Sequence, residues 1–263
     1  MKKLYVAVCL AFFYAPIAVL IFYSFNASKS HNVFTGFSLR WYSELFHNET
    51  IASALITTLI VALISSIFAT ILGTLAAIGI SSMRKTFRTA MLNFTYIPIV
   101  SPEIVMGVSL MLLFALFKID SGFTTLILAH ITFNVPYVVL SVMPKLRQMD
   151  KNLYDAALDL GCNPIQAFTK VMLPEIMPGI ISGFLMSLTF SIDDFNVSYF
   201  VAGDKFQTLP ILIYSMTRRR VSPEINALST IIFLVVLVVL IIVNIYSVRA
   251  EKKAQRKGDA VYD

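Results

Sequence analysis

The chain has 263 residues, of which 57% are hydrophobic and only 14% are charged. A soluble globular domain has roughly 25% charged residues, so the composition excludes an ordinary soluble fold and predicts an integral membrane protein. The net charge of +6 is attributed to membrane topology and contact with anionic lipids, and we expect no nucleic-acid binding. Two cysteines, Cys9 and Cys162, indicate no disulfide framework and no cysteine-rich metal site, and we expect no metal and no cofactor.

Six segments are apolar enough and long enough to cross a bilayer, which takes about 20 residues per helix. They are Leu4–Ser28, Thr50–Met83, Thr89–Phe117, Ser121–Pro144, Ile176–Phe200 and Ile225–Val248. The sequence therefore predicts an all-α membrane protein with six transmembrane helices. The first segment, within residues 1–28, follows Lys2 and Lys3 but is too long for a cleaved signal peptide and lacks a good cleavage site.

The placement of Lys and Arg predicts the orientation of the chain. If the N-terminus lies inside, about two thirds of the 21 basic residues fall in cytoplasmic segments, as the positive-inside rule requires. We therefore expect a multi-pass cell-membrane protein with both termini in the cytoplasm, ending in a basic tail at 249–263. The cluster Arg218–Arg220 is the exception, because it would lie outside, in contact with either an extracytoplasmic partner or lipid headgroups.

After the first helix, residues 29–49 form a predicted extracytoplasmic segment. Within it, Phe37–Phe46 has amphipathic helical spacing, and Trp41 is interpreted as an anchor at the membrane interface, with contact to an outside partner as the alternative. The remaining core, 50–248, is expected to hold five helices.

Prolines and glycines mark special positions within the core. Pro98 and Pro102 lie in the middle of the third apolar segment and should kink or interrupt it, because proline removes a helical hydrogen bond. Gly73 and Gly79 in the second segment predict faces for close helix packing.

A polar loop at 147–175 separates the fourth and fifth apolar segments and reads as two short helices. Asp150 is a plausible N-cap of the first helix, and Gly161 follows it where a positive φ is required. Asn163 and Pro164 begin the second helix as N-cap and first residue, and Leu173-Pro174 is expected to end it. Ile165, Phe168 and Met172 share one stripe of the second helix, and an exposed apolar stripe implies a partner surface.

The stretch DAALDLG and the following MLP resemble the EAA loop of ABC importer permeases, in which a short helix docks on a cytoplasmic ATPase. Asp155 replaces the glutamate that is frequent in that family. The resemblance implies that the following residues couple this chain to an ATPase: Asp155, Ala156, Ala157, Gly161, Asn163, Pro164, Phe168, Leu173 and Pro174.

Further stretches are similar to the spermidine/putrescine importer permeases, specifically to their C-type subunit. They include VSPEIVMGVSLMLLF, AHITFNVPYVVLSV, SLTFSIDDFNVSYFVAG and VSPEINALSTI. This resemblance implies a type I ABC importer permease fold. It also implies an assembly with a second, related permease subunit, an ATPase dimer and an extracytoplasmic polyamine-binding protein.

Carboxylates within a bilayer are costly and are functional candidates by default. At about 1.5 Å per residue, Glu103, Asp193 and Asp194 reach the outer half of the membrane, at a depth similar to that of His130 and Asn134. We expect these five residues to line a substrate path. An acidic region near aromatic side chains (Phe133, Tyr137, Phe195 and Tyr199) favours a cationic amine.

Each of these assignments has a structural alternative. Neighbouring helical residues point about 100° apart, so at most one of Asp193 and Asp194 is expected to face the path. The other would cap a helix break or pair with Lys205 or the arginines. Glu103 could instead satisfy the kink at Pro102, and His130 could be a packed, hydrogen-bonded histidine.

The leading hypothesis is a permease subunit of an ATP-driven polyamine importer that works by alternating access. The chain has no phosphate-binding loop motif, so ATP hydrolysis is assigned to a partner and the chain itself is not expected to be an enzyme. A proton-coupled secondary transporter of a cationic solute is the alternative. A membrane enzyme has no HExxH, Ser–His–Asp or Cys–His pattern to support it.

Overall fold

In the computed structural model, two units of the chain are each compact. The structure describes residues 2–28, 33–150, 152–219, 223–235, 237–238 and 241. One unit comprises 1–49 and 213–263, and the other comprises 50–212. The described residues form helices and one isolated β-bridge, between Asn26 and Phe37, so the predicted all-α class is confirmed.

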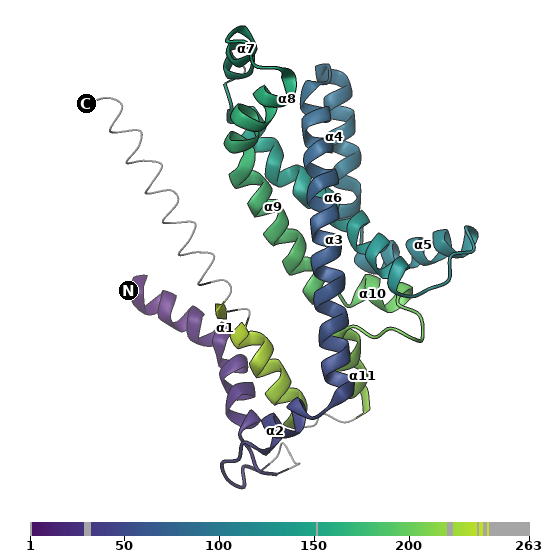
Figure 1. The fold of residues 1–263 in the computed structure, drawn as a ribbon. Coiled ribbons are helices and arrows are strands. Elements are labelled where there is room, and N and C mark those ends of the chain that lie inside the picture. The colour runs from purple at the N-terminus through teal and green to yellow at the C-terminus, as the bar shows by residue number, and fades with distance from the viewer. Residues whose placement is uncertain are drawn as a thin grey trace. The chain divides into compact units, whose positions relative to one another are not determined.

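Most helices belong to the second unit (Figure 1). These are α3 (Glu49–Ser82), α4 (Lys85–Val100), α5 (Glu103–Leu116), α6 (Phe123–Gln148), α7 (Asn152–Asp159), α8 (Pro164–Ala167), a π-helical turn (Phe168–Met172), α9 (Leu173–Asp193), α10 (Asn196–Val201) and α11 (Leu209–Arg219), the last of which crosses the boundary between the units. The first unit contains α1 (Lys2–Ser24), α2 (Arg40–Phe46) and a helix at Pro223–Val235.

Four helices are long and apolar enough to cross a membrane: Leu4–Ser24, Glu49–Ser82, Phe123–Gln148 and Pro164–Asp193. The pair α4 and α5 supplies a fifth crossing if it is counted as one bent span. The predicted sixth helix, Ile225–Val248, is helical through 235, and most of its remainder falls outside the described residues. The multi-pass architecture is confirmed, and the count of six stays a prediction.

Helix α6 is the centre of the second unit, and glycines bring its neighbours close. A Cβ atom built on Gly73 of α3 would lie 2.6 Å from the Cβ of Val138, which is fully buried. Gly179 and Gly183 of α9 approach the same helix, at Ser141 and Val138. The predicted close packing holds for Gly73, whereas a Cβ at Gly79 would meet nothing within 4 Å.

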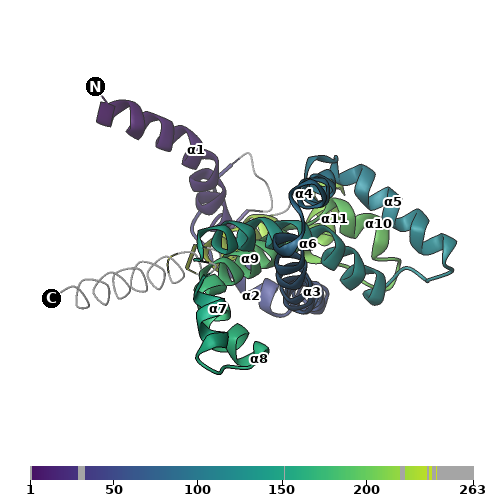
Figure 2. The same cartoon turned by 90° about the horizontal axis from the view of Figure 1, so that it is seen from above.

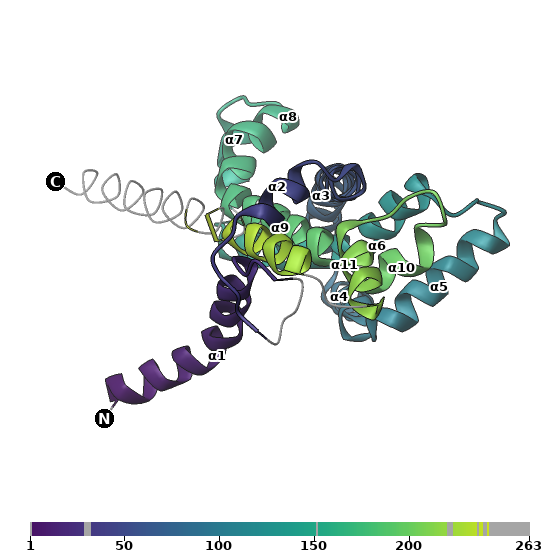
Figure 3. The ribbon, with the colours of Figure 1, turned by 90° about the horizontal axis from the view of Figure 1, so that it is seen from below.

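The third apolar segment is broken, as its prolines predict. Ser101 and Pro102 adopt extended conformations between α4 and α5, and the two helices meet at a bend of 103°. Pro102 has no N–H to offer to the helical carbonyls before it, and it disfavours a helical conformation at the residue preceding it. As a result α5 stands apart from α3 and α4, with α10 as its neighbour (Figures 2 and 3).

The fifth predicted segment, Ile176–Phe200, is not one continuous helix, which corrects the sequence-based prediction. Helix α9 ends at Asp193, Asp194 is extended, and α10 begins at Asn196. The break coincides with the polar residues Asp193, Asp194 and Asn196, which interrupt the otherwise apolar segment.

The predicted turn of the loop at 147–175 is confirmed. Gly161 has φ +88° after α7. Asn163 accepts a hydrogen bond from the backbone N–H of Gln166 at 2.8 Å, the Gln166 side chain accepts one from the Asn163 N–H at 3.1 Å, and Pro164 begins α8.

The expected helix end at Leu173-Pro174 is wrong. A π-helical turn, in which the N–H of Leu173 donates to the carbonyl of Phe168, joins α8 to α9. The wider turn admits Pro174, which lacks an N–H and would crowd an α-helical turn. One helix therefore runs from Pro164 to Asp193.

In the first unit, Trp41 is only 2% exposed and donates from Nε1 to the carbonyl of Asn26 at 2.6 Å. It is an internal residue of that unit, and the interpretation as an exposed membrane anchor is wrong. The amphipathic helix is confirmed as α2. Arg218 and Arg219 end α11, and Arg220 lies outside the described residues.

The contrast between the two glycines of α3 provides a test of this packing. We expect Gly73→Ala to lower the stability of the folded chain by about 1–3 kcal/mol, because the added methyl group overpacks the contact with Val138. Gly79→Ala is the matched control, because it adds helix propensity in open space. Thermal unfolding in detergent measures both, and equal transition temperatures would contradict the assignment of α6 as the packing centre.

Candidate functional site

The two helix breaks of the second unit face one cavity of about 410 Å³. Both the α4–α5 break and the α9–α10 break contribute to its wall. The lining residues are Pro98, Ile99, Ser101, Pro102, Glu103, Met106, Phe133, Tyr137, Phe190, Asp193, Asp194, Phe195, Asn196 and Val197. Of the five residues expected on a substrate path, three line the cavity: Glu103, Asp193 and Asp194. The other two, His130 and Asn134, lie outside its lining.

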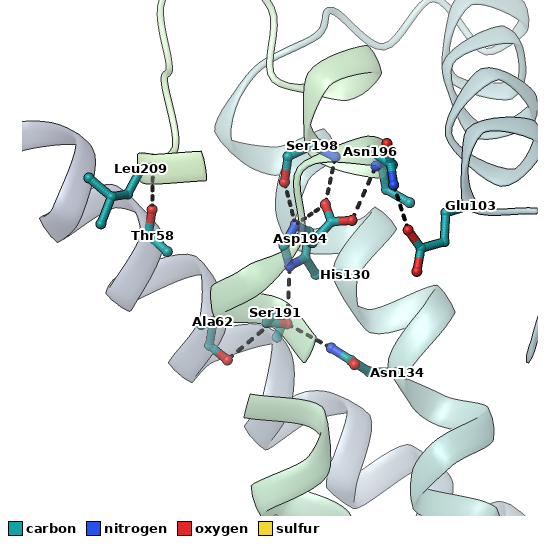
Figure 4. A network of polar contacts seen from close by, with 12 residues as sticks. Thr58, Ala62, Glu103, His130, Asn134, Ser191, Asp194, Asn196, Ser198 and Leu209 are labelled. Atoms are coloured by element: carbon teal, nitrogen blue, oxygen red, sulfur yellow. Dashed lines mark hydrogen bonds and ion pairs between the residues drawn. The ribbon is translucent and has the colours of Figure 1, made fainter. Parts of the chain in front are cut away.

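The three acids have different surroundings. Asp194 is buried and caps α10, since its carboxylate accepts hydrogen bonds from the backbone N–H groups of Val197 (3.2 Å) and Ser198 (2.7 Å). Glu103 is the first residue of α5 and accepts a hydrogen bond from Nδ2 of Asn196 at 2.6 Å (Figure 4). Asp194 therefore takes the role of capping a break, and its titratable neighbour is His130, with Lys205 and Arg218 not among its contacts.

Asp193 differs from the other two acids. It is the last residue of α9, is exposed, and makes no hydrogen bond or ion pair with any residue that the structure describes. An acid at a helix N-terminus is favoured by the helix dipole by about 0.3–1 kcal/mol, and one at the C-terminus is disfavoured by a similar amount. Glu103 and Asp194 therefore stabilise the N-terminal ends of α5 and α10. Asp193 instead destabilises the C-terminal end of α9, so it has no evident structural role.

Helix ends of both signs meet at the cavity, because each break ends one helix and begins another. Helices α4 and α9 both end at it, and each helix end carries carbonyl groups without partners inside the helix. At the end of α4, the carbonyl of Pro98 would take its bond from residue 102, but Pro102 has no N–H. The carboxylates of Glu103 and Asp193 both face this space, and their negative charge suits a cation.

His130 and Asn134 form a polar network behind this wall. His130 is 1% exposed, with Nδ1 3.0 Å from Oγ of Ser191 and Nε2 2.9 Å from Oγ of Ser198 (Figure 4). Asn134 donates to the same Ser191 hydroxyl at 2.8 Å, and Ser65 of α3 lies 3.1 Å from it. The network joins α3, α6, α9 and α10, and it holds the end of α9 and the start of α10 in place.

Ser198, His130 and Asp194 come together in space although the sequence shows no catalytic pattern. Asp194 Oδ2 is 3.6 Å from His130 Nε2, the nitrogen that also faces Ser198. In a catalytic triad the acid and the nucleophile occupy opposite nitrogens of the imidazole, and the hydroxyl is accessible. Here both partners share one nitrogen and Ser198 is fully buried, so the cluster is a structural contact.

Aromatic side chains form much of the remaining wall. Phe133, Tyr137 and Phe195 line the cavity as expected, whereas Tyr199 is not in the lining and packs against Phe195 at a centroid distance of 5.4 Å. Phe190, which the sequence analysis missed, lies 4.4 Å from Tyr137 by ring centroids. Its position one turn before Asp193-Asp194 is the signal that could have identified it.

The loop with the EAA resemblance forms a compact two-helix unit at the start of α9, away from the cavity. Ala157 and Ala167 are buried between its short helices, and Phe168 is half-buried. The exposed members of the predicted coupling set are Asp155, Ala156, Gly161, Asn163, Pro164 and Pro174. Among apolar side chains, Leu160 and Ile165 are 87% and 74% exposed, whereas Met172 packs on the core of the second unit.

Residues 69–256 match the family described as the binding-protein-dependent transport system inner membrane component. The chain belongs to this family. It is 38% identical over 235 residues to a spermidine/putrescine transport system permease protein PotC of Haemophilus influenzae, covering 89% of this chain and 91% of that protein. It is 40% identical over 254 residues to the putrescine transport system permease protein PotI of Escherichia coli K12, covering 93% and 90%.

The fold agrees with this assignment. A bacterial ABC transporter involved in the import of the acidic polysaccharide alginate has a chain that aligns with a TM-score of 0.71 at 17% identity, over 94% of both chains. This member of the family is a membrane permease component of an ABC importer and not an enzyme. Family membership implies ATPase and binding-protein partners and a paired permease, and it disfavours the proton-coupled secondary transporter.

The turn at Gly161 provides a test of the loop. We expect Gly161→Pro to abolish copurification of the ATPase, because proline fixes φ near −65° where the chain requires +88°. Gly161→Asn is the matched control, since asparagine tolerates positive φ and no atom lies within 4 Å of an added Cβ. Membrane insertion should be unchanged in both variants, and an intact ATPase complex with the proline variant would contradict the assignment.

Proposed function

We propose that this chain is a permease subunit through which an ATP-driven importer moves a cationic polyamine of the spermidine/putrescine class into the cytoplasm. The substrate path includes the cavity between the two helix breaks. The observation that carries the proposal is Asp193, an exposed carboxylate that faces the cavity from a helix C-terminus and has no partner in the described chain.

The composition of the cavity matches the chemistry of a polyamine. Two carboxylates attract ammonium groups, and aromatic faces bind them further by cation–π attraction, worth about 0.5–2 kcal/mol each. The methylene segments of a polyamine can lie against Met106 and the phenylalanines. An anionic substrate would be repelled by the same wall, so likeness to an alginate importer concerns the fold alone.

Helix continuity supplies a mechanical route for alternating access. The helix that begins in the coupling loop at Pro164 ends in the cavity at Asp193, about 45 Å away at 1.5 Å per residue. Closure of an ATPase dimer would move the loop, and the helix would carry that displacement to Asp193. The coupling surface comprises the exposed residues Asp155, Ala156, Gly161, Asn163 and Pro164, together with Leu160 and Ile165.

The orientation and assembly are part of the proposal. Both termini lie in the cytoplasm, which places the coupling loop on the side of the ATPase and the mid-membrane carboxylates towards the outside. A second, related permease subunit completes the pathway, and an extracytoplasmic polyamine-binding protein delivers the substrate. The cluster Arg218–Arg220 is assigned to contact either that protein or lipid headgroups.

The paired aspartates provide the test. In the reconstituted importer with its loaded binding protein at saturation, we expect Asp193→Asn to lower polyamine transport about tenfold, which corresponds to about 1.4 kcal/mol of lost cation stabilisation. ATP hydrolysis should stay within about twofold, because the coupling loop is intact. The measurement is the amount of labelled polyamine transported per ATP hydrolysed.

Asp194→Asn should behave differently, because Asp194 caps α10 and faces His130. We expect it to lower the thermal stability of the complex, since loss of a helix cap typically costs about 1 kcal/mol. If the ratio of transport to ATP hydrolysis is unchanged in both Asp193→Asn and Glu103→Gln, the proposal that the substrate path includes this cavity is contradicted.

A further inference from the structure

Asn196 joins the two helix breaks through its side chain. It stands at the first position of α10, lines the cavity, and donates from Nδ2 to Oε2 of Glu103 at the first position of α5, 93 residues away in the sequence. We propose that Asn196 is a positioning residue that holds the Glu103 carboxylate in the orientation that receives an ammonium group. The proposal rests on the proposed function, in which this cavity carries a polyamine.

Asn196 is presented by a rigid segment. The carboxylate of Asp194 caps the first turn of α10, and the hydroxyl of Ser198 is hydrogen-bonded to the buried imidazole of His130. Val197 and Val201 are buried in the core of the second unit. The first turn of α10 is therefore fixed on several sides, and the Asn196 side chain projects from a well-defined position.

Helix α5 is held against the same segment. A Cβ atom at Gly107 would lie 2.8 Å from the ring of Phe200 and 3.2 Å from the carbonyl of Asn196, so the two helices touch through this glycine. The close approach fixes the distance between the backbones that carry Asn196 and Glu103. The hydrogen bond between the two side chains thus bridges two elements whose separation does not depend on it.

The Glu103 side chain itself has little other support. It follows a bend of 103°, it is exposed, and Asn196 provides the one hydrogen bond that its carboxylate receives from the described residues. A glutamate side chain has several rotatable bonds, and an unanchored one samples many rotamers. A charge-assisted hydrogen bond is short and strong, as the 2.6 Å distance indicates, and it selects one orientation.

An amide is suited to this task because it orients the carboxylate without neutralising it. An ionised carboxylate offers about four acceptor positions, and Asn196 occupies one of them. A lysine here would remove the charge that a polyamine needs, and an aspartate would repel Glu103. Glu103 therefore keeps its charge and its second oxygen for a cationic ligand.

A double-mutant cycle tests this role in the complete reconstituted importer. The readout is labelled polyamine transported per ATP hydrolysed, with saturating loaded binding protein and with the thermal stability of every complex measured. We expect Asn196→Ala to lower this ratio about fivefold and Glu103→Gln about tenfold. The double variant should be within about twofold of Glu103→Gln alone, because Asn196 acts through Glu103.

Two further variants complete the design. Asn196→Leu removes the donor while retaining bulk, and it replaces the alanine variant if that complex assembles poorly. Thr132→Ala, on an exposed part of α6, is the control and should leave the ratio unchanged. Multiplicative losses in the double variant, or an unchanged ratio in both Asn196 variants, would overturn the proposal.

Asp193→Asn, measured in parallel, separates the two levels of inference. If Asp193→Asn lowers the ratio and the Asn196 variants do not, the polyamine path stands and the positioning role fails. If neither Asp193→Asn nor Glu103→Gln changes the ratio, the cavity is not the path, and the proposed function of the site fails together with the role of Asn196.

Discussion

Interrupted helices within the membrane segments are the constraint on which the rest of this structure depends. Lipid offers no hydrogen bonds, so a broken span must satisfy its free backbone groups within protein or at a water-filled cavity. Here the α4–α5 break and the α9–α10 break face the same cavity of about 410 Å³. Asp194 satisfies N–H groups that begin α10. The proposed preference of the cavity for cations therefore depends on the carboxylates of Glu103 and Asp193.

The break after Asp193 also sets where the long helix that begins in the coupling loop ends. Because the π-helical turn admits Pro174 without a break, the helix that starts in the coupling loop continues to Asp193. A rigid element of this kind transmits a displacement better than two helices joined by a flexible turn. At Gly179 and Gly183, the absence of a side chain brings the backbone of α9 close to α6. Small-residue interfaces allow helices in membranes to pack closely.

Local sequence signals predicted the local structure well. Gly161, Asn163 and Pro164 each impose a backbone preference, and the structure shows all three in the predicted roles. Pro102 likewise predicted a break, although not a bend of 103°. The alternative that one of the paired aspartates caps a helix break is the one that Asp194 follows, although the expected continuous segment did not include the break. The continuation through Pro174 was missed, because it depends on a wider turn. Pairings such as Asn196 with Glu103 cannot be read from spacing, since tertiary packing alone brings these residues together.

The three membrane acids show why residue type alone does not identify a binding residue. All three are carboxylates at similar depth, and the intramembrane location makes each a functional candidate. Their positions relative to helix ends distinguish them. The carboxylate of Asp194 accepts backbone hydrogen bonds at the start of α10, and that of Glu103 lies at the start of α5 and accepts one hydrogen bond. Asp193 lies at the C-terminal end of α9, where the helix dipole disfavours a negative charge, and its carboxylate has no hydrogen bond within the described chain. A charge that its own helix disfavours needs compensation from elsewhere. Under the proposed function, the substrate itself is the compensating cation, bound to Asp193 while the cavity is occupied.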